Sequence, residues 1–329
     1  MTRPAPDLTV IVISYNTRAL TLAALRTLYA QTSETDMEVI VLDNASADGS
    51  ADAIAAAFPQ ARLIRAPENL GFARANNVAA ARARGAWLLL LNPDTEIRDR
   101  AVDRLMAFAR AHPSHGIYGG RTVFPDGTLN PTSCWGRITL WSVLCSATGL
   151  TAAFPRSRLF NPETIGGWGR DSVREVDIVT GCFLLIPRAL WDRLGGFDLK
   201  YFMYGEEADL CLRAGRLGYR PVVTPEAEIM HLVGASANTR ADRAVRVARA
   251  RATLIRDHWP AWKVPLGLGA MWAGVGLRRL VSAARARAGG PARAGAAALW
   301  REVWRARRVW LAGYAPLGEA GGRPPDAPS

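Results

Sequence analysis

Sequence features that mark several common protein classes are missing from this 329-residue chain. Its four cysteines form no CxxC pair, so we expect reduced thiols of a cytoplasmic protein. The first seven residues contain no apolar stretch suited to a signal peptide, and the first apolar run, residues 8–13, is too short to span a bilayer. No GxGxxG sequence follows that run, which excludes a dinucleotide-binding dehydrogenase.

The composition and the position of the charges suggest a globular body with a basic appendage. Hydrophobic residues make up 49% of the chain and charged residues 21%, as in globular proteins. The net charge is +12, yet residues 1–239 hold 24 basic and 24 acidic residues. Residues 240–310 hold 16 basic residues and three acidic ones, whereas residues 311–329 have a net charge of −1. We therefore expect a neutral body over 1–239, a basic region over 240–310 and a disordered Gly- and Pro-rich tail.

Strand and helix patterns alternate over the first hundred residues. Short apolar runs predict strands at residues 8–13, 38–42, 61–65 and 86–91. Helical spacing appears at residues 20–29, 51–58 and 72–84. This order predicts a parallel sheet covered on both faces by helices. Right-handed crossovers bring the carboxyl ends of parallel strands to one edge, where ligands bind in such sheets.

Short polar side chains follow each of these four predicted strands. They include Ser14, Tyr15, Asn16, Asp43, Asn44, Asn69, Asn92 and Asp94. Each of them alone could be an N-cap or a turn residue. Four strand ends of this kind at one sheet edge favour a ligand site.

The middle of the chain has a less regular pattern. Residues 124–127 predict a hairpin turn, and residues 130–170 have the composition of a long irregular insertion. Strand character returns at residues 176–186 and again at 221–223, with a helix predicted over 206–217. From residue 238 onward the pattern is helical and rich in arginine.

Asp94 and His231 are candidate ligands for a divalent cation. Asp94 follows a strand of four leucines and is held in a tight turn by Pro93. Mg²⁺ and Mn²⁺ take oxygen ligands and need only one or two protein carboxylates when a nucleotide diphosphate supplies others. His231 could add an imidazole ligand, although a lone histidine can equally be a buried structural residue.

Acidic residues at the start of the predicted helix 206–217 are candidates for a general base. Glu206, Glu207 and Asp209 follow the aromatic loop 201–205. An acidic first turn that complements the helix dipole explains Asp209 or Glu206 adequately. A carboxylate half-buried among aromatic rings has a raised proton affinity, which suits a general base.

Taken in order, these motifs resemble family 2 glycosyltransferases, especially the bacterial rhamnosyltransferase-like members. The resemblance covers residues 7–240 and rests on the ordered set, since each motif alone is weak. The matching segments are residues 12–16 (VISYN), 43–50 (DNASADGS), 68–77 (ENLGFARANN), 90–94 (LLNPD), 180–183 (TGCF), 195–198 (GGFD), 206–211 (EEADLC), 218–219 (GY) and 231–236 (HLVGAS).

The resemblance implies an α/β fold of GT-A type, with a mainly parallel central sheet flanked by helices and a C-terminal basic helical appendage. It also implies donor-site residues: the loop Ser14 to Asn16 beside the nucleotide, Asp43 on the base with Asn44 next to it, and Asn69, Arg74 and Asn76 in the donor pocket.

The same resemblance implies roles for the remaining candidates. Asp94 stands at the second aspartate of the family's DxD metal motif, Asn92 replaces the first, and His231 completes a Mg²⁺ or Mn²⁺ site. Gly181 and Asp209 lie on the acceptor side. The family's base is usually the Asp of a Glu-Asp pair, which corresponds here to Glu207, with Glu206 as the alternative.

The predicted activity is an inverting, metal-dependent sugar transfer in cell-envelope polysaccharide synthesis. The resemblance to the rhamnosyltransferase-like subgroup implies dTDP-rhamnose as the donor and a glycan or lipid-linked glycan as the acceptor. A nucleotidyltransferase would need a Gly-rich basic phosphate loop, which residues 14–16 do not provide. A membrane-tethered, non-catalytic nucleotide-sugar-binding protein is the remaining alternative, and the acidic and histidine candidates argue against it.

Residues 240–310 interleave arginines with six tryptophans. The apolar segment 264–277 is shorter than the roughly 20 residues of a spanning helix. Helices with apolar faces and many arginines bind anionic membrane surfaces. A packed helical appendage and a nucleic-acid-binding region are alternatives, and we expect no nucleic acid because the body carries no such motif. The sequence thus predicts a cytoplasmic protein, peripheral on the inner face of the cell membrane.

Overall fold

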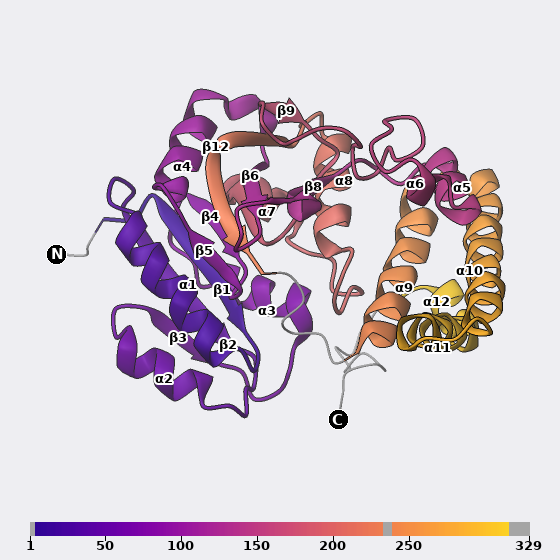
Figure 1. Ribbon diagram of the computed structural model, residues 1–329. Coiled ribbons are helices and arrows are strands. Elements are labelled where there is room, and N and C mark those ends of the chain that lie inside the picture. Colours follow the sequence, from indigo (N-terminus) through magenta and orange to yellow (C-terminus); the bar gives the residue numbers. More distant parts are fainter. Residues whose placement is uncertain (1–3, 233–238, 316–329) are drawn as a thin grey trace.

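The computed structural model describes residues 4–232 and 239–315 (Figure 1). The strands are β1 (Leu8–Ser14), β2 (Met37–Asp43), β3 (Arg62–Arg65), β4 (Trp87–Leu91), β5 (Thr95–Ile97), β6 (Tyr118–Val123), β7 (Leu129–Asn130), β8 (Cys134–Trp135), β9 (Arg174–Glu175), β10 (Ile178–Val179), β11 (Phe183–Pro187) and β12 (Val222–His231). The α-helices are α1 (Arg18–Gln31), α2 (Ser50–Ala57), α3 (Gly71–Ala80), α4 (Ala101–Ala111), α5 (Leu140–Thr148), α6 (Leu150–Ala153), α7 (Arg188–Leu194), α8 (Glu206–Arg216), α9 (Arg240–His258), α10 (Val264–Ala286), α11 (Pro291–Arg305) and α12 (Arg307–Ala312).

The central sheet has the strand order β3-β2-β1-β4-β11-β6-β12-β5. The first four strands in this order are parallel, in a register that places Ser14 opposite Asp43. Strand β11 is antiparallel to both of its neighbours, and β12 is parallel to β6. The predicted α/β fold with a mainly parallel sheet is therefore confirmed, and the four predicted strand ends do share one edge.

Both faces of the parallel strands are buried, which explains their continuous apolar sequences. On β1, Val10 and Val12 face the hydrophobic cluster formed with α1, α2 and α4. Ile11 and Ile13 face the opposite cluster, formed with α3, α7 and α8. Because alternate side chains of a strand point to opposite faces, a strand covered on both sides needs apolar residues throughout.

Two expected strands differ from the structure. The predicted strand 176–186 is divided into β10 and β11, because β10 pairs with β8 in a separate two-stranded sheet. The short strand expected at 221–223 is the start of the ten-residue β12. Its register shifts between Thr224 and Glu228, and this irregularity hides the long strand from a period-two pattern.

The segment 130–170, expected to be irregular, contains the α-helices α5 and α6, a short 3-10 helix and part of the two-stranded sheet. Helix α5 begins with a capping box, in which the Thr139 side chain accepts from Ser142 N at 3.1 Å and Thr139 N donates to Ser142 Oγ at 2.9 Å. The hairpin expected around 124–127 is confirmed as the antiparallel pair β6 and β7.

Helices α9 to α12 form a C-terminal helical region that packs on α5 (Figure 1). A third hydrophobic cluster holds it together, with Val143 of α5 against Ile255, Met271, Val303 and Trp310. Within residues 4–232 and 239–315, no helix combines the length and the apolar character that crossing a bilayer requires.

Candidate active site

A cavity of about 670 Å³ lies between the carboxyl ends of the parallel strands and the helices α8, α9 and α5. The strand side contributes Tyr15, Asn44 and Asp94, among others. The helix side contributes Glu206 and Glu207 together with side chains of α5 and α9. This volume is in the range of pockets that bind small molecules and cofactors.

The loop before α3 is held to the end of β2 by two asparagine side chains. Asn44 Nδ2 donates to Asn69 Oδ1 at 2.9 Å, and Asn44 Oδ1 accepts from Leu70 N at 2.8 Å. Asn69 Oδ1 also accepts from Gly71 N at 2.9 Å. Both asparagines line the cavity, so this hydrogen-bonded pair fixes one wall of the predicted donor pocket.

Asp43 and Asn16 lie next to residues of this wall but do not line the cavity themselves. Asp43 is buried; its Oδ2 accepts from Ser46 N at 3.1 Å, whereas Oδ1 has no protein partner among the described residues. A buried acceptor without a partner fits a ligand's N–H donor, such as the imide of a pyrimidine base. Asn16 is exposed, and its side chain accepts from Ala47 N at 2.8 Å, which connects the loops after β1 and β2.

Four more of the predicted site residues lie outside the cavity lining. Ser14 is buried, with its hydroxyl 3.0 Å from that of Thr21 on α1. Arg74 is 3.8 Å from the Glu68 carboxylate, and Asn76 is buried inside α3, where it donates to Phe72 O at 2.9 Å.

Asp209 is the fourth of them. It faces away from the cavity and binds Arg213 Nε at 2.7 Å and His258 Nε2 at 2.9 Å. The last of these contacts joins α8 to the carboxyl end of α9.

The structure brings Asp94 and His231 together at the sheet edge. Pairing of β12 with β5 sets His231 opposite Thr95, and Leu232 N donates to Asp94 O at 3.0 Å. Asp94 Oδ1 is 3.3 Å from His231 Nε2, and both side chains are about nine-tenths buried. Burial lowers the pKa of His231, but the neighbouring Cys182 and Asp94 raise it, to about 10 overall.

This pair fits a hard divalent cation that a substrate diphosphate helps to hold. Asp94 supplies a carboxylate oxygen and His231 an imidazole, and His231 Nδ1 is buried with no hydrogen-bond partner in the part of the chain that the structure describes. The described residues contain no group of three or more acidic, His or Cys side chains that could hold a metal. Mg²⁺ often has only one or two protein ligands, with phosphate and water as the others.

Glu206 and Glu207 enter the cavity from the first turn of α8, which a strained loop positions. Tyr204 and Gly205 both have a positive φ, of 70° and 94°, and a Cβ on Gly205 would lie 3.0 Å from the Tyr201 ring. This conformation turns the chain sharply, so that the first turn of α8 points at the cavity.

The environments of the two glutamates differ. Burial raises the pKa of Glu206 well above its ordinary value, and the charge of Glu207 raises it further. Burial also raises the pKa of Glu207, which is only half-buried. The Oε2 atom of each is buried and has no protein partner within residues 4–232 and 239–315. Because Glu206 is buried and Glu207 only half-buried, burial opposes the ionisation of Glu206 more than that of Glu207.

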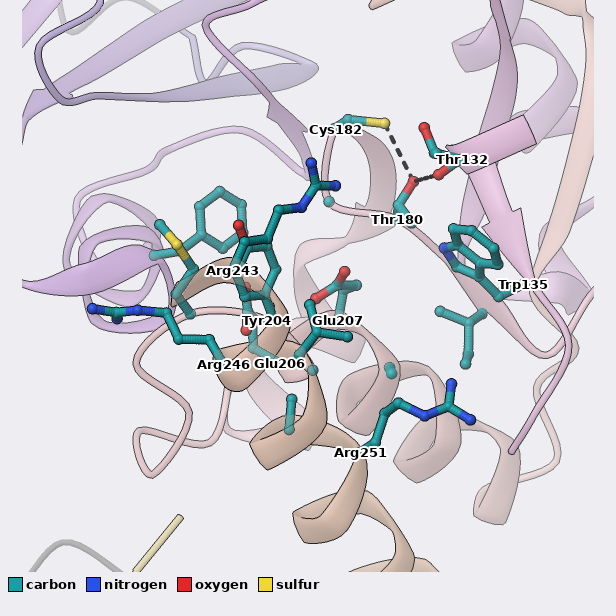
Figure 2. Close-up of a pocket in the computed structure, with 18 of the residues that line it drawn as sticks. Thr132, Trp135, Thr180, Cys182, Tyr204, Glu206, Glu207, Arg243, Arg246 and Arg251 are labelled. Carbon is teal, nitrogen blue, oxygen red and sulfur yellow. Dashed lines mark hydrogen bonds between the residues drawn. The ribbon is translucent and has the colours of Figure 1, made fainter. Parts of the chain in front are cut away.

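The helix side of the cavity contains residues that the sequence interpretation did not single out. Arg243, Arg246 and Arg251 of α9 line it, and Figure 2 shows them on the helix next to Glu206 and Glu207. Their spacing along the helix indicates a shared face, but no local pattern could show that this face covers the site. Gly181, which the family resemblance puts on the acceptor side, lines the cavity, and a Cβ there would lie 3.1 Å from the Phe72 ring.

Comparison with known families agrees with this geometry. The family model described as glycosyl transferase family 2 matches residues 9–191, which is more than half of the chain. The chain belongs to glycosyltransferase family 2. The predicted family and enzyme class are thereby confirmed.

Similar proteins have related names. An N-acetylglucosaminyl-diphospho-decaprenol L-rhamnosyltransferase of Mycobacterium tuberculosis is 30% identical over 217 residues, covering 60% of this chain and 67% of that protein. The O-antigen biosynthesis protein RfbC of Myxococcus xanthus is 28% identical over 73% of this chain, but only 18% of its own length is matched. The resemblance to the rhamnosyltransferase-like subgroup is confirmed.

A solved mannosyltransferase from Pyrobaculum calidifontis, in complex with GDP-Man and Mn²⁺, has a similar fold. The TM-score is 0.55 at 21% identity, and the match covers 94% of this chain and 84% of that one. At this identity the similarity supports the GT-A type fold alone.

Proposed function

We propose that this glycosyltransferase transfers a sugar, with inversion and with a bound Mg²⁺ or Mn²⁺, from a nucleotide donor to a lipid-linked glycan of the cell envelope. The leading donor is dTDP-rhamnose, because the mycobacterial relative is named as a rhamnosyltransferase. That name also indicates a diphospho-polyprenol-linked N-acetylglucosamine as the class of acceptor. The observation that carries the proposal is one cavity lined by both the Asp94–His231 pair and the two glutamates of α8.

The donor nucleotide would occupy the strand side of this cavity. Tyr15 and the Asn44–Asn69 pair border it. Asp43 lies behind this wall, and its Oδ1, which has no partner among the described residues, would be the acceptor for the base. Asp94 and His231 would hold the cation, which supplies positive charge to the diphosphate leaving group. A histidine ligand must be neutral, so His231 would hold the cation in its deprotonated form.

Glu207 is the proposed general base, because it is the less buried of the two glutamates. It accepts the proton of the acceptor hydroxyl as that oxygen attacks the anomeric carbon opposite the leaving diphosphate. One carbon–oxygen bond forms while the other breaks, and this single displacement inverts the anomeric centre. Burial and the charge of Glu207 raise the pKa of Glu206, so a proton on Glu206 would leave Glu207 free to act as the base.

We also propose that residues 1–239 form the GT-A domain and that residues 240–310 hold the enzyme at the inner face of the membrane. The latter region has a net charge of +13, from 16 basic and three acidic residues, whereas residues 1–239 are neutral. Large apolar side chains are exposed on it, among them Trp262 and Leu280, both 66% exposed. Exposed tryptophan and leucine beside many arginines suit an anionic lipid surface.

The test is turnover of a panel of dTDP-, UDP- and GDP-sugars, with Mg²⁺, Mn²⁺ or EDTA. The wild-type protein should turn over one donor in a metal-dependent way, and Asp94→Ala and Glu207→Gln should lose at least about a hundredfold of that activity. Glu226→Gln, an exposed substitution outside the cavity, is the matched control. Full activity in both active-site variants would show that the assigned residues are wrong.

The pH dependence separates Glu207 from an ordinary exposed carboxylate. Because burial raises its pKa, kcat/KM should fall as the pH decreases through a value above the usual pKa of about 4.3 for glutamate. Glu206→Gln should retain a larger share of activity than Glu207→Gln. The reverse order would assign the base to Glu206.

A further inference from the structure

The helix side of the cavity carries a pair of arginines to which the proposed reaction assigns no role. Arg243 and Arg246 lie three residues apart on α9 and both line the cavity. Arg251, on the same wall, is already engaged, because its guanidinium binds the Glu163 carboxylate through two bonds of 2.5 and 2.9 Å. Within the described parts of the chain, no carboxylate pairs with Arg243 or Arg246.

The two arginines are close to the proposed base. Tyr204 lines the same cavity, and both charged pairs act on its hydroxyl. Burial raises the pKa of this hydroxyl, Arg243 and Arg246 lower it, and the charges of Glu206 and Glu207 raise it. The Tyr204 hydroxyl is therefore within electrostatic range of both pairs. Figure 2 shows the same neighbourhood, with the arginine side chains on α9 beside Tyr204 and the glutamates.

The guanidinium groups are positioned for a ligand with several oxygen acceptors. Arg246 lies over the Phe202 ring, at 5.5 Å from its centroid, and a stacking contact of this kind does not engage the N–H edges of a guanidinium. Arg243 is exposed at the cavity mouth. Paired guanidinium forks match the geometry of phosphate oxygens, and two of them suit a diphosphate better than a single phosphate.

The position of α9 favours the acceptor over the donor. The Asp94–His231 pair, which would hold the donor diphosphate, lies at the sheet edge. Figure 1 shows the parallel strands on one side of α8 and α9 to α12 on the other. The helices that continue from α9 also carry the exposed Trp262 and Leu280, so a lipid-borne substrate arriving from that side meets α9 first.

We propose that Arg243 and Arg246 form a second phosphate-binding subsite, which holds the diphosphate of a polyprenyl-linked acceptor while its sugar reaches Glu207. This inference rests on the proposed function, because it assumes an acceptor of that class. The subsite fixes the distance between lipid anchor and reacting hydroxyl. It selects acceptors whose sugar is attached through a diphosphate.

The experiment compares Arg243→Ala, Arg246→Ala and the double variant with Arg240→Ala. Arg240 is an exposed arginine at the start of the same helix that does not line the cavity, so it controls for the loss of one charge. Two acceptors are used with the preferred donor: a short-chain polyprenyl diphospho-N-acetylglucosamine and an octyl N-acetylglucosaminide, which has no phosphate.

Each single variant should raise KM for the diphosphate acceptor about tenfold and the double variant about a hundredfold, since each loses one charged hydrogen-bond donor. The donor KM should stay at the wild-type value, and the rate with the octyl glycoside should fall much less than the rate with the diphosphate acceptor. All constants of Arg240→Ala should stay at wild-type values. An unchanged KM for the diphosphate acceptor would overturn the inference. A raised donor KM instead would assign the arginines to the donor nucleotide and would also overturn it.

Direct binding keeps this test separate from the proposed function. Calorimetric titration with the polyprenyl diphospho-sugar should show binding to the wild type and at least tenfold weaker binding to the double variant. If the donor turns over but the lipid diphosphate does not bind, the subsite is refuted and the proposed donor chemistry stands. If the lipid diphosphate binds through the two arginines but no donor turns over, the subsite stands and the proposed transfer is refuted.

Discussion

Substitution of Asp209 distinguishes a structural role from the acceptor contact that the sequence predicts. The side chain is 3% exposed and accepts from Arg213 at 2.7 Å and from His258 at 2.9 Å. Removing one partner of a buried ion pair costs about 3–5 kcal/mol. Arg213 also donates to Leu194 O and Gly196 O, at 2.6 and 2.8 Å, so it keeps acceptors when the carboxylate is gone. We therefore expect Asp209→Ala to lose about 3 kcal/mol, the lower end of that range.

The assay is urea unfolding followed by tryptophan fluorescence, together with donor and acceptor kinetics on the folded variant. Asp192→Ala is the matched control, because Asp192 faces Arg188 one helical turn away in an exposed pair that should contribute less than about 1 kcal/mol. A loss of less than about 1 kcal/mol for Asp209→Ala, with a raised acceptor KM, would refute the structural role. It would instead support the acceptor contact implied by the family resemblance.

Asp209 also makes the free energy of unfolding depend on pH. Burial raises the pKa of Asp209, but the bonds from His258 and Arg213 outweigh this and lower the pKa below its ordinary value. A depressed pKa in the folded state means that the stabilisation is present above the unfolded-state value of about 3.9 and is lost as the pH falls through the folded-state value. The difference in unfolding free energy between wild type and Asp209→Ala should therefore shrink on acidification below about pH 4.

Two further predictions concern the loop before α8 and the membrane. Gly71→Ala should lower the free energy of unfolding by more than about 1 kcal/mol and remove most of the activity, because the φ of Gly71 is +74° and a Cβ would lie 2.5 Å from Phe202 O in that loop. The control is Gly215→Ala on α8, where a Cβ would meet open space. It should be neutral or stabilising in the same urea assay. Trp262→Ser with Leu280→Ser should weaken sedimentation with anionic liposomes without changing donor turnover; unaltered liposome binding would contradict the proposed membrane surface.

The parallel half of the sheet could be predicted from sequence because its signal is local. Residues 8–13 and 86–91 are continuous apolar runs, and buried parallel strands need nothing else to be recognised. The polar residues after them are adjacent in sequence to the strand ends, so the sequence is sufficient to place Asn44, Asn69 and Asp94 at one edge. All three line the cavity.

The antiparallel half could not be predicted in the same way, because its pairing partners are far apart in the chain. The division of residues 176–186 depends on β8, more than forty residues earlier, whose pairing with β10 no local pattern reveals. Asn76 and Arg74 share a motif with Asn69, but the helical geometry of α3 directs them elsewhere: Asn76 is buried against Phe72 O. A motif gives the order of residues, whereas the face of the helix decides which of them reaches the ligand.

Helix α9 links the basic region, residues 240–310, to the active site at two points. The proposed GT-A domain, residues 1–239, and the basic region therefore contribute to one active site. Near its beginning, Arg243 and Arg246 face the cavity. At its end, His258 binds Asp209 on the helix that also carries Glu207. Removal of the helices that follow residue 239 would take away one cavity wall and a partner of a buried carboxylate. A chain cut there should therefore lose transfer activity even in detergent, where no membrane is needed, whereas a region that only tethers the enzyme to lipid would be dispensable under those conditions.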